Sequence, residues 1–155
     1  VMRAARILLV LGACLPLAVS TSRAQFMIRT QGPAPLLTVT TATPGSEPAP
    51  VVNTGSRLRY RRALVITKVT VATVCPGQKF TLRLLAQNPS PGSAAGEVTL
   101  ADGMPPRDLI VGIPAGFFQL GDCVLLYTAA PTFSQGNSTE LGPDSHLVTF
   151  TLVAQ

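Results

Sequence analysis

Apolar and polar residues alternate along two segments of this chain. In residues 79–88 one face has Phe80, Leu82, Leu84 and Ala86, and the other has Lys79, Thr81, Arg83 and Gln87, with Leu85 as the one exception to the alternation. Because successive side chains of a β-strand point to opposite faces, this pattern predicts a strand with one buried face. Residues 146–155 alternate in the same way, with apolar residues at Val148, Phe150, Leu152 and Ala154. Some positions between these are also apolar, so we expect this second strand to be central in its sheet.

Turn-forming residues divide the rest of the C-terminal part into short pieces. Glycine, proline or both occur in residues 88–92, 102–103, 114–116 and 142–144. The segments between these turns are candidate strands, at residues 64–74, 97–101, 108–113 and 123–129. No stretch has the 3.6-residue period of a helix. Short strands at this spacing predict an all-β fold. We expect a single antiparallel immunoglobulin-like β-sandwich over residues 57–155.

The segment before this domain has a different composition. Residues 25–56 contain five prolines, at positions 33, 35, 44, 48 and 50. Proline cannot donate a backbone hydrogen bond, so this density excludes a helix or a central strand. We expect a Pro-rich, extended and mobile N-terminal segment, with one short strand at residues 36–43.

The first 24 residues have the order of an export signal. Arg3 and Arg6 precede an almost entirely apolar run at residues 7–19, and Ser22-Arg23-Ala24 places small residues where a signal peptidase cleaves. The run is too short to span a bilayer comfortably. We therefore expect cleavage before Gln25, a secreted, periplasmic or cell-surface protein, and no membrane span afterwards. An alternative stays open, because residues 11–14 resemble a lipoprotein signal in which Cys14 would carry the lipid.

Removing this signal changes the charge balance. Three of the 12 basic residues, and none of the 7 acidic ones, lie in residues 1–24. The mature chain is then only weakly basic, with 9 basic and 7 acidic residues. A nucleic-acid partner is therefore not expected.

Two cysteines, Cys75 and Cys123, remain in the mature chain. In an oxidising compartment such a pair favours a disulfide over a metal site or a nucleophile. We expect this bridge at one edge of the fold, because Cys75 ends one predicted strand and Cys123 begins another. Closing a loop of roughly 50 residues contributes about 4 kcal/mol in the chain-entropy model.

Residues for catalysis and metal binding are few. The one histidine, His146, follows Asp144 and Ser145, but consecutive residues on a strand cannot converge as a catalytic triad. With the cysteines paired, no transition-metal set is left. We therefore expect no enzyme activity, no cofactor and no metal, and we interpret His146 as a polar residue where the last strand begins.

Two surface features suggest contacts with other molecules. Arg57, Arg59 and Arg61 alternate with Leu58 and Tyr60, so three guanidinium groups would line one face of a strand. Together with Tyr60 they are candidate ligands for an acidic polysaccharide, a lipid headgroup or phosphate. The interpretation we favour from sequence is that these charges guard an exposed sheet edge. The second feature is the apolar loop at residues 116–121, which we expect to cap the core rather than form a contact patch.

The export signal, the expected disulfide and the C-terminal strand at residues 146–155 together resemble bacterial secreted immunoglobulin-like domains, including pilin-like surface subunits. The resemblance implies an exported, non-enzymatic structural or adhesive subunit that contacts copies of itself or envelope polymers. Residues 37–41 are β-prone and could add a strand to a neighbouring copy, pair with their own domain, or belong to a solvated tether to a partner. The alternative function is a binding module for an acidic polysaccharide or another envelope polymer.

Overall fold

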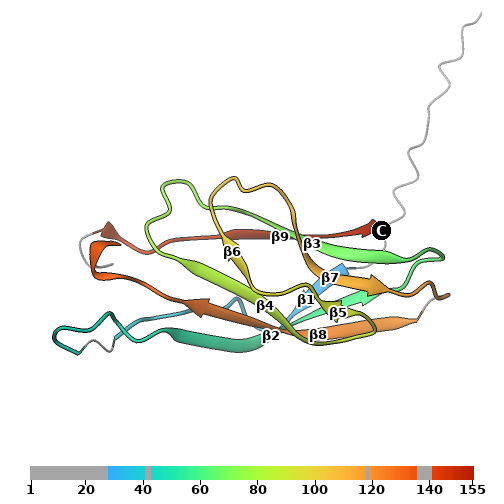
Figure 1. The fold of residues 1–155 in the computed structure, drawn as a ribbon, viewed down its shortest axis with the longest axis horizontal. Helices are drawn as coiled ribbons and strands as arrows, with labels where there is room; N and C mark the ends of the chain where they lie inside the picture. Colours follow the sequence, from blue (N-terminus) through green and yellow to red (C-terminus); the bar gives the residue numbers. More distant parts are fainter. Residues whose placement is uncertain (1–27, 41–42, 118, 136–140) are drawn as a thin grey trace, which may run out of the picture.

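The computed structural model describes residues 28–40, 43–117, 119–135 and 141–155. These residues form two antiparallel sheets, with a 3₁₀ turn at Phe133–Gln135 (Figure 1). The five-stranded sheet has the order β1 (Ile28–Gln31), β2 (Val51–Arg61), β8 (Leu120–Ala129), β4 (Leu82–Ser90) and β6 (Val98–Leu100). The four-stranded sheet has the order β5 (Ser93–Ala94), β7 (Arg107–Ile113), β3 (Thr67–Val74) and β9 (Leu147–Ala154). The predicted all-β class is confirmed.

The core lies between the two sheets and is built from alternate residues of their strands. β2, β4 and β8 contribute Leu58, Tyr60, Leu84, Ala86, Cys123, Leu125 and Tyr127, and β3 and β7 contribute Val69, Val71, Leu109, Ile110 and Ile113. The alternation at residues 79–88 therefore identified the buried face, since Leu84 and Ala86 are fully enclosed. β4 itself begins only at Leu82, because the N–H groups of Lys79 and Phe80 donate to the carboxylate of Asp144 rather than to a neighbouring strand.

The N-terminal segment is more ordered than the sequence predicted. β1 pairs with β2 along its whole length, and residues 51–56 already belong to β2, so the expected boundary at residue 57 falls inside a strand. The predicted strand at 36–43 is absent over residues 36–40, although Leu37 packs against the core. Residues 41–42 lie outside the described residues, as do residues 1–27, which include the predicted signal and Cys14.

β9 occupies an edge rather than the centre of its sheet. It pairs with β3 from Thr67–Ala154 to Val74–Leu147, and no second partner for it occurs among the residues that the structure describes. Its apolar side at Val148, Phe150 and Leu152 packs against the core as predicted. The side chain of Leu147 on the opposite face is 70% exposed, so apolar residues on both faces do not make this strand central.

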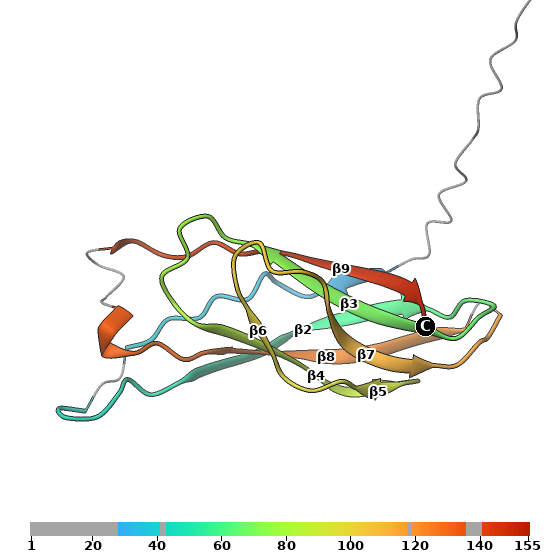
Figure 2. The same ribbon diagram turned by 45° about the horizontal axis from the view of Figure 1, so that its top comes forward.

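Two loops are joined at one end of the molecule, at residues 62–66 and 114–117 (Figure 2). Gly116 N–H donates to Ala63 O at 2.7 Å, and the side chain of Arg62 donates to the carbonyls of Pro114 and Ala115 at 2.9 and 2.6 Å. Leu64, Val65, Ile66 and Phe117 are exposed here, and we call these four residues the apolar tip. The 116–121 loop therefore does not bury Phe117 over the core as expected, and Phe118 lies outside the described residues.

Gly121 is a position where a single methyl group should destabilise the fold. It lies opposite Tyr60 in the ladder, and a Cβ there would be 2.3 Å from Tyr60 Cε2 and 2.9 Å from Pro91 Cδ. We expect Gly121→Ala to lower the free energy of unfolding by about 1–3 kcal/mol, because Tyr60 is fully buried and cannot move aside freely. Urea denaturation measures the loss.

The matched control is Gly55→Ala, which also adds a methyl group to a glycine of the five-stranded sheet. Its nearest neighbour would be Asn53 Oδ1 at 3.3 Å, near the surface, so the expected change is within about 0.5 kcal/mol. Equal losses in the two variants would contradict the proposed clash with Tyr60.

Candidate functional site

Four arginines share the outer surface of β1 and β2. The ladder places Arg29 directly opposite Arg59, and directly opposite residues of paired strands project from the same face. Leu58 and Tyr60 are buried in the core, so Arg57, Arg59 and Arg61 between and beside them point outward. We call Arg29, Arg57, Arg59 and Arg61 the arginine face. Arg29 was missed from the sequence because it lies in the Pro-rich segment that was expected to be unpaired.

The position of β2 contradicts the edge-guard interpretation of these charges. β2 lies between β1 and β8, and its backbone is hydrogen-bonded on both sides. Charges on an interior strand do not protect an open edge from pairing with another chain. The arginine face is therefore a broad charged surface rather than a charged rim.

One carboxylate stands beside the arginine face. Asp122 lies opposite Arg59 in the β2–β8 ladder and forms an ion pair with Arg57. The arginine face also contains a shallow hollow of about 120 Å³, which is lined by Arg29, Arg59, Tyr60, Arg61 and Leu120. Three arginines from two neighbouring strands therefore take part in lining this hollow.

Tyr60 does not belong to the binding surface that was predicted with it. Its side chain has no exposed area, and its hydroxyl donates to the carbonyl of Pro91 at 2.5 Å. The alternation of the strand explains the correction, because Tyr60 follows Arg59 and precedes Arg61 and therefore points to the opposite face. Tyr60 therefore offers no exposed atom to a ligand on the outer surface.

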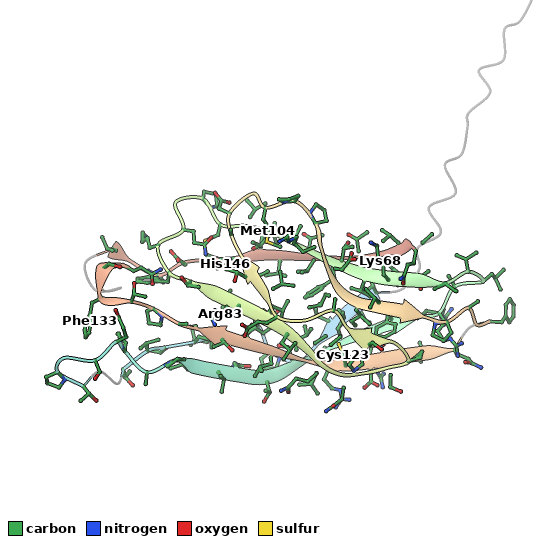
Figure 3. The ribbon with its side chains drawn as sticks, in the orientation of Figure 1. Lys68, Arg83, Met104, Cys123, Phe133 and His146 are labelled. Carbon is green, nitrogen blue, oxygen red and sulfur yellow. The ribbon has the colours of Figure 1, made fainter. Side chains whose placement is uncertain are left out.

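The predicted disulfide between Cys75 and Cys123 is not formed. Both are free and buried thiols. Cys75 follows β3 of the four-stranded sheet, whereas Cys123 lies inside β8 of the other sheet, opposite Leu58. Figure 3 shows Cys123 well separated from His146, which is the neighbour of Cys75. The prediction was wrong because β8 begins at Leu120, and Cys123 is therefore not at a strand end.

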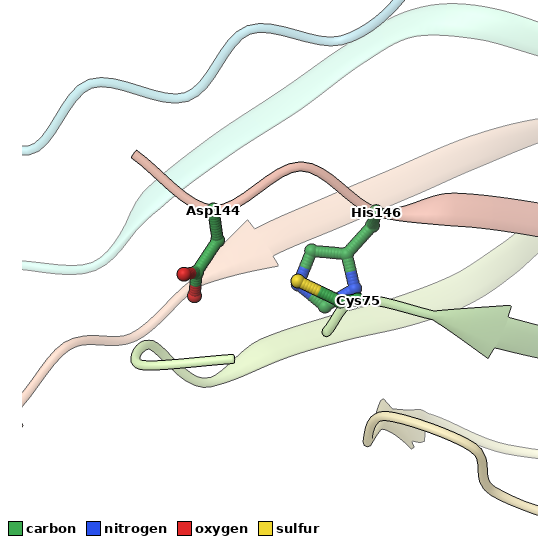
Figure 4. Close-up of side chains that lie close together, drawn as sticks. All are labelled: Cys75, Asp144 and His146. Atoms are coloured by element: carbon green, nitrogen blue, oxygen red, sulfur yellow. The ribbon is translucent and has the colours of Figure 1, made fainter. Parts of the chain in front are cut away.

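Instead, Cys75 lies in a cluster with Asp144 and His146 (Figure 4). One ligand atom of each residue, a sulfur, a carboxylate oxygen and a ring nitrogen, lies within 4.8 Å of the other two. The β3–β9 pairing brings them together, since Val74 is opposite Leu147 and the chain positions next to them are Cys75 and His146. Sequence reasoning missed this cluster because it assigned Cys75 to a disulfide and treated His146 alone.

Neighbouring groups hold each member of the cluster. The carboxylate of Asp144 accepts backbone N–H groups from Lys79 at 2.9 Å and Phe80 at 2.7 Å. His146 Nδ1 is 3.2 Å from the hydroxyl of Thr73, which is itself buried. The Cys75 thiol has a backbone hydrogen bond from Ser145.

The electrostatics of the cluster keep both Cys75 and His146 uncharged at neutral pH. Burial, followed by the charge of Asp144, raises the pKa of the Cys75 thiol above its ordinary value. Burial lowers the pKa of His146, against the opposing effect of Asp144 and Asp102. A protonated thiol next to a neutral imidazole is not the thiolate–imidazolium pair of an activated cysteine nucleophile.

No protein-family model matches this chain, and neither a curated protein nor a solved structure matches it significantly. Within the part of the chain that the structure describes, no helix is long and apolar enough to cross a bilayer.

Proposed function

We propose that this protein is an exported, non-enzymatic adhesive domain of the immunoglobulin-like β-sandwich type, which holds an acidic polysaccharide of the cell envelope. The observation that carries the proposal is the arginine face. It presents Arg29 on the edge strand β1 and Arg57, Arg59 and Arg61 on β2, the interior strand paired with it. One carboxylate, that of Asp122, is placed beside them by the ladder.

The spacing of these arginines suits a polymer with repeated negative charges. Side chains two residues apart on a strand are about 6.6–6.8 Å apart, and neighbouring strands are about 4.7–4.9 Å apart. Arg57, Arg59 and Arg61 therefore form a row along β2, and Arg29 lies beside its middle. A guanidinium group can hold a carboxylate or sulfate by two parallel hydrogen bonds, and Arg29 and Arg59 are placed beside the hollow where such a group would bind. Because the mature chain is only weakly basic, attraction of the polymer would be confined to this face.

Removing charge from the arginine face should weaken binding to an acidic polysaccharide. We expect Arg29→Ser/Arg59→Ser to lower the affinity for immobilised alginate or heparin at least about tenfold, because both side chains line the hollow. The affinity of the unaltered protein should also fall as salt is raised, since exposed charges are screened. Surface plasmon resonance at several salt concentrations measures both effects.

The matched control removes the same number of charges elsewhere. Arg83→Ser/Arg107→Ser alters two exposed arginines that lie outside the arginine face, and it should leave the affinity within about twofold of the original. An equal loss of affinity in both double variants would contradict a specific site, because binding would then depend only on the net charge of the protein. Unchanged binding in Arg29→Ser/Arg59→Ser would reject the proposal. Binding to anionic phospholipid vesicles would be tested with Leu64→Ser/Ile66→Ser, which alters the apolar tip. If vesicle binding occurs and is lost in this variant, the ligand is a lipid surface instead.

A second candidate is the self-assembling structural subunit expected from the sequence. The observation that favours it is the edge position of β9, because an edge strand can accept an added strand from another copy. The stretch that was expected to supply such a strand, residues 37–41, contributes Leu37 to its own core instead. Size-exclusion chromatography at increasing concentration distinguishes the candidates, because strand addition predicts oligomers and the binding domain does not require them.

A further inference from the structure

We propose that Cys75, Asp144 and His146 bind a divalent transition-metal ion of the Zn²⁺ type. The three residues offer one sulfur, one oxygen and one nitrogen atom, all within 4.8 Å of one another. They come from the end of β3 and from the segment that leads into β9, and the pairing of these two strands positions them. The inference is independent of the arginine face.

The chemistry of the donors selects the class of metal. Thiolate and imidazole are ligands of Zn²⁺ and similar ions, whereas Ca²⁺ and Mg²⁺ prefer sites made of oxygen atoms alone. Zn²⁺ binds sulfur at about 2.3 Å and nitrogen or oxygen at about 2.0–2.2 Å, so ligand atoms of a tetrahedral site are roughly 3.3–3.7 Å apart. Reaching this spacing would require small rotations of Asp144 and His146, whose side chains are both partly exposed.

The surroundings of the cluster orient its donors as a metal site requires. Thr73 contacts Nδ1 of His146 at 3.2 Å, and in the tautomer in which Nδ1–H donates to this hydroxyl, the lone pair of Nε2 is available for a metal. Two backbone N–H groups hold the carboxylate of Asp144, and a backbone hydrogen bond from Ser145 reaches the sulfur of Cys75. Hydrogen bonds of this kind from surrounding groups are typical of ligated carboxylates and thiolates.

A fourth ligand would come from beside the cluster, to which Asp102 itself does not belong. Asp102 accepts the backbone N–H of Cys75 at 2.7 Å through Oδ1, and its exposed position leaves room for water as well. Either the second oxygen of Asp102 or a water molecule would complete a tetrahedron. On binding, the Cys75 thiol releases its proton to solvent and the resulting thiolate coordinates the ion.

Such an ion would cross-link two segments that are distant in sequence. It would join the end of β3 to residues 144–146, directly before β9, and would hold this edge strand against its neighbour. The sequence predicted that a disulfide would cross-link the chain. In this proposal a metal ion would form the cross-link instead, with Cys75 as its only thiolate ligand.

Cobalt provides a direct test, because thiolate coordination to Co²⁺ produces a charge-transfer absorption that aqueous Co²⁺ lacks. Titration of the reduced, exported protein with CoCl₂ should give this absorption with an endpoint at one equivalent, and ZnCl₂ should abolish it by displacement. Zn²⁺ should also raise the thermal midpoint of the protein. No charge-transfer band at stoichiometric Co²⁺ would refute the proposal.

Three variants and one control assign the ligands. Cys75→Ser should eliminate the charge-transfer band, and His146→Gln and Asp144→Asn should each weaken Co²⁺ binding more than about tenfold. Cys123→Ala, which removes the other thiol, should leave both the band and the endpoint unchanged. His146→Gln changes a partly exposed side chain, so it also tests the site if Cys75→Ser fails to fold. A band that persists without Cys75, or that disappears without Cys123, would contradict the assignment.

Discussion

Replacing Tyr60 with alanine is expected to lower the free energy of unfolding by about 3–5 kcal/mol, the usual loss for a large buried aromatic side chain. Tyr60 has no exposed area, packs in the core between the two sheets and lies opposite Gly121, the glycine that makes room for its ring. Alanine would leave a cavity that the paired strands cannot close, because their hydrogen bonds hold β2 and β8 in place. Urea denaturation at neutral pH measures the loss.

Tyr60→Phe separates the ring from the hydroxyl. This variant retains the packing and removes only the hydrogen bond to the carbonyl of Pro91, so the expected loss is about 1 kcal/mol. It should leave polysaccharide binding unchanged, since Tyr60 points away from the arginine face. A loss of binding in Tyr60→Phe without a loss of stability would restore Tyr60 to the ligand site that the sequence predicted. Equal stability losses in the alanine and phenylalanine variants would contradict its role in packing.

Alkaline pH should destabilise this protein substantially, because Cys123, Tyr127 and Tyr60, in addition to Cys75, are buried in their neutral forms. Burial raises the pKa of Cys123 from 9.0 to about 11 and the pKa of Tyr127 from 10.0 to about 12, and it raises that of Tyr60 further. A folded-state pKa above the unfolded one means that the stabilisation is complete below the unfolded value. It is lost as the pH rises towards the folded value.

For Cys123 the loss begins near pH 9 and continues to about pH 11. A pKa difference of this size between the unfolded and folded states corresponds to about 3 kcal/mol for Cys123 alone. Urea midpoints of the reduced protein at about pH 8, 9, 10 and 11 measure the decline. Cys123→Ala should decline less steeply between pH 9 and 10, because one of the buried acids is gone. A wild-type midpoint that stays constant over this range would show that these groups titrate normally in the folded protein.

The buried face of a strand could be predicted from the sequence, because the alternation of side chains along a strand depends only on neighbouring residues. The alternation at residues 79–88 identified Leu84 and Ala86 as buried, and that at 146–155 identified the inward side of β9. The start of β2 was missed because residues 53–56, Asn-Thr-Gly-Ser, have no apolar residue to mark a buried face. Pairing with β8, at Asn53 and Ser56 on either side of an irregularity, holds this stretch in β2.

The sequence by itself therefore determined the all-β class, most strands and their inward faces, since these depend on residues close together in the chain. Only the tertiary structure decided which strands are neighbours. Because β2 lies between β1 and β8, its arginines form a surface rather than a charged sheet edge. The pairing with β1 also places Arg29 beside them. The pairing of β3 with β9 separated Cys75 from Cys123 and placed it beside Asp144 and His146. Strand order depends on contacts between residues far apart in sequence, and the local period of two contains no information about them.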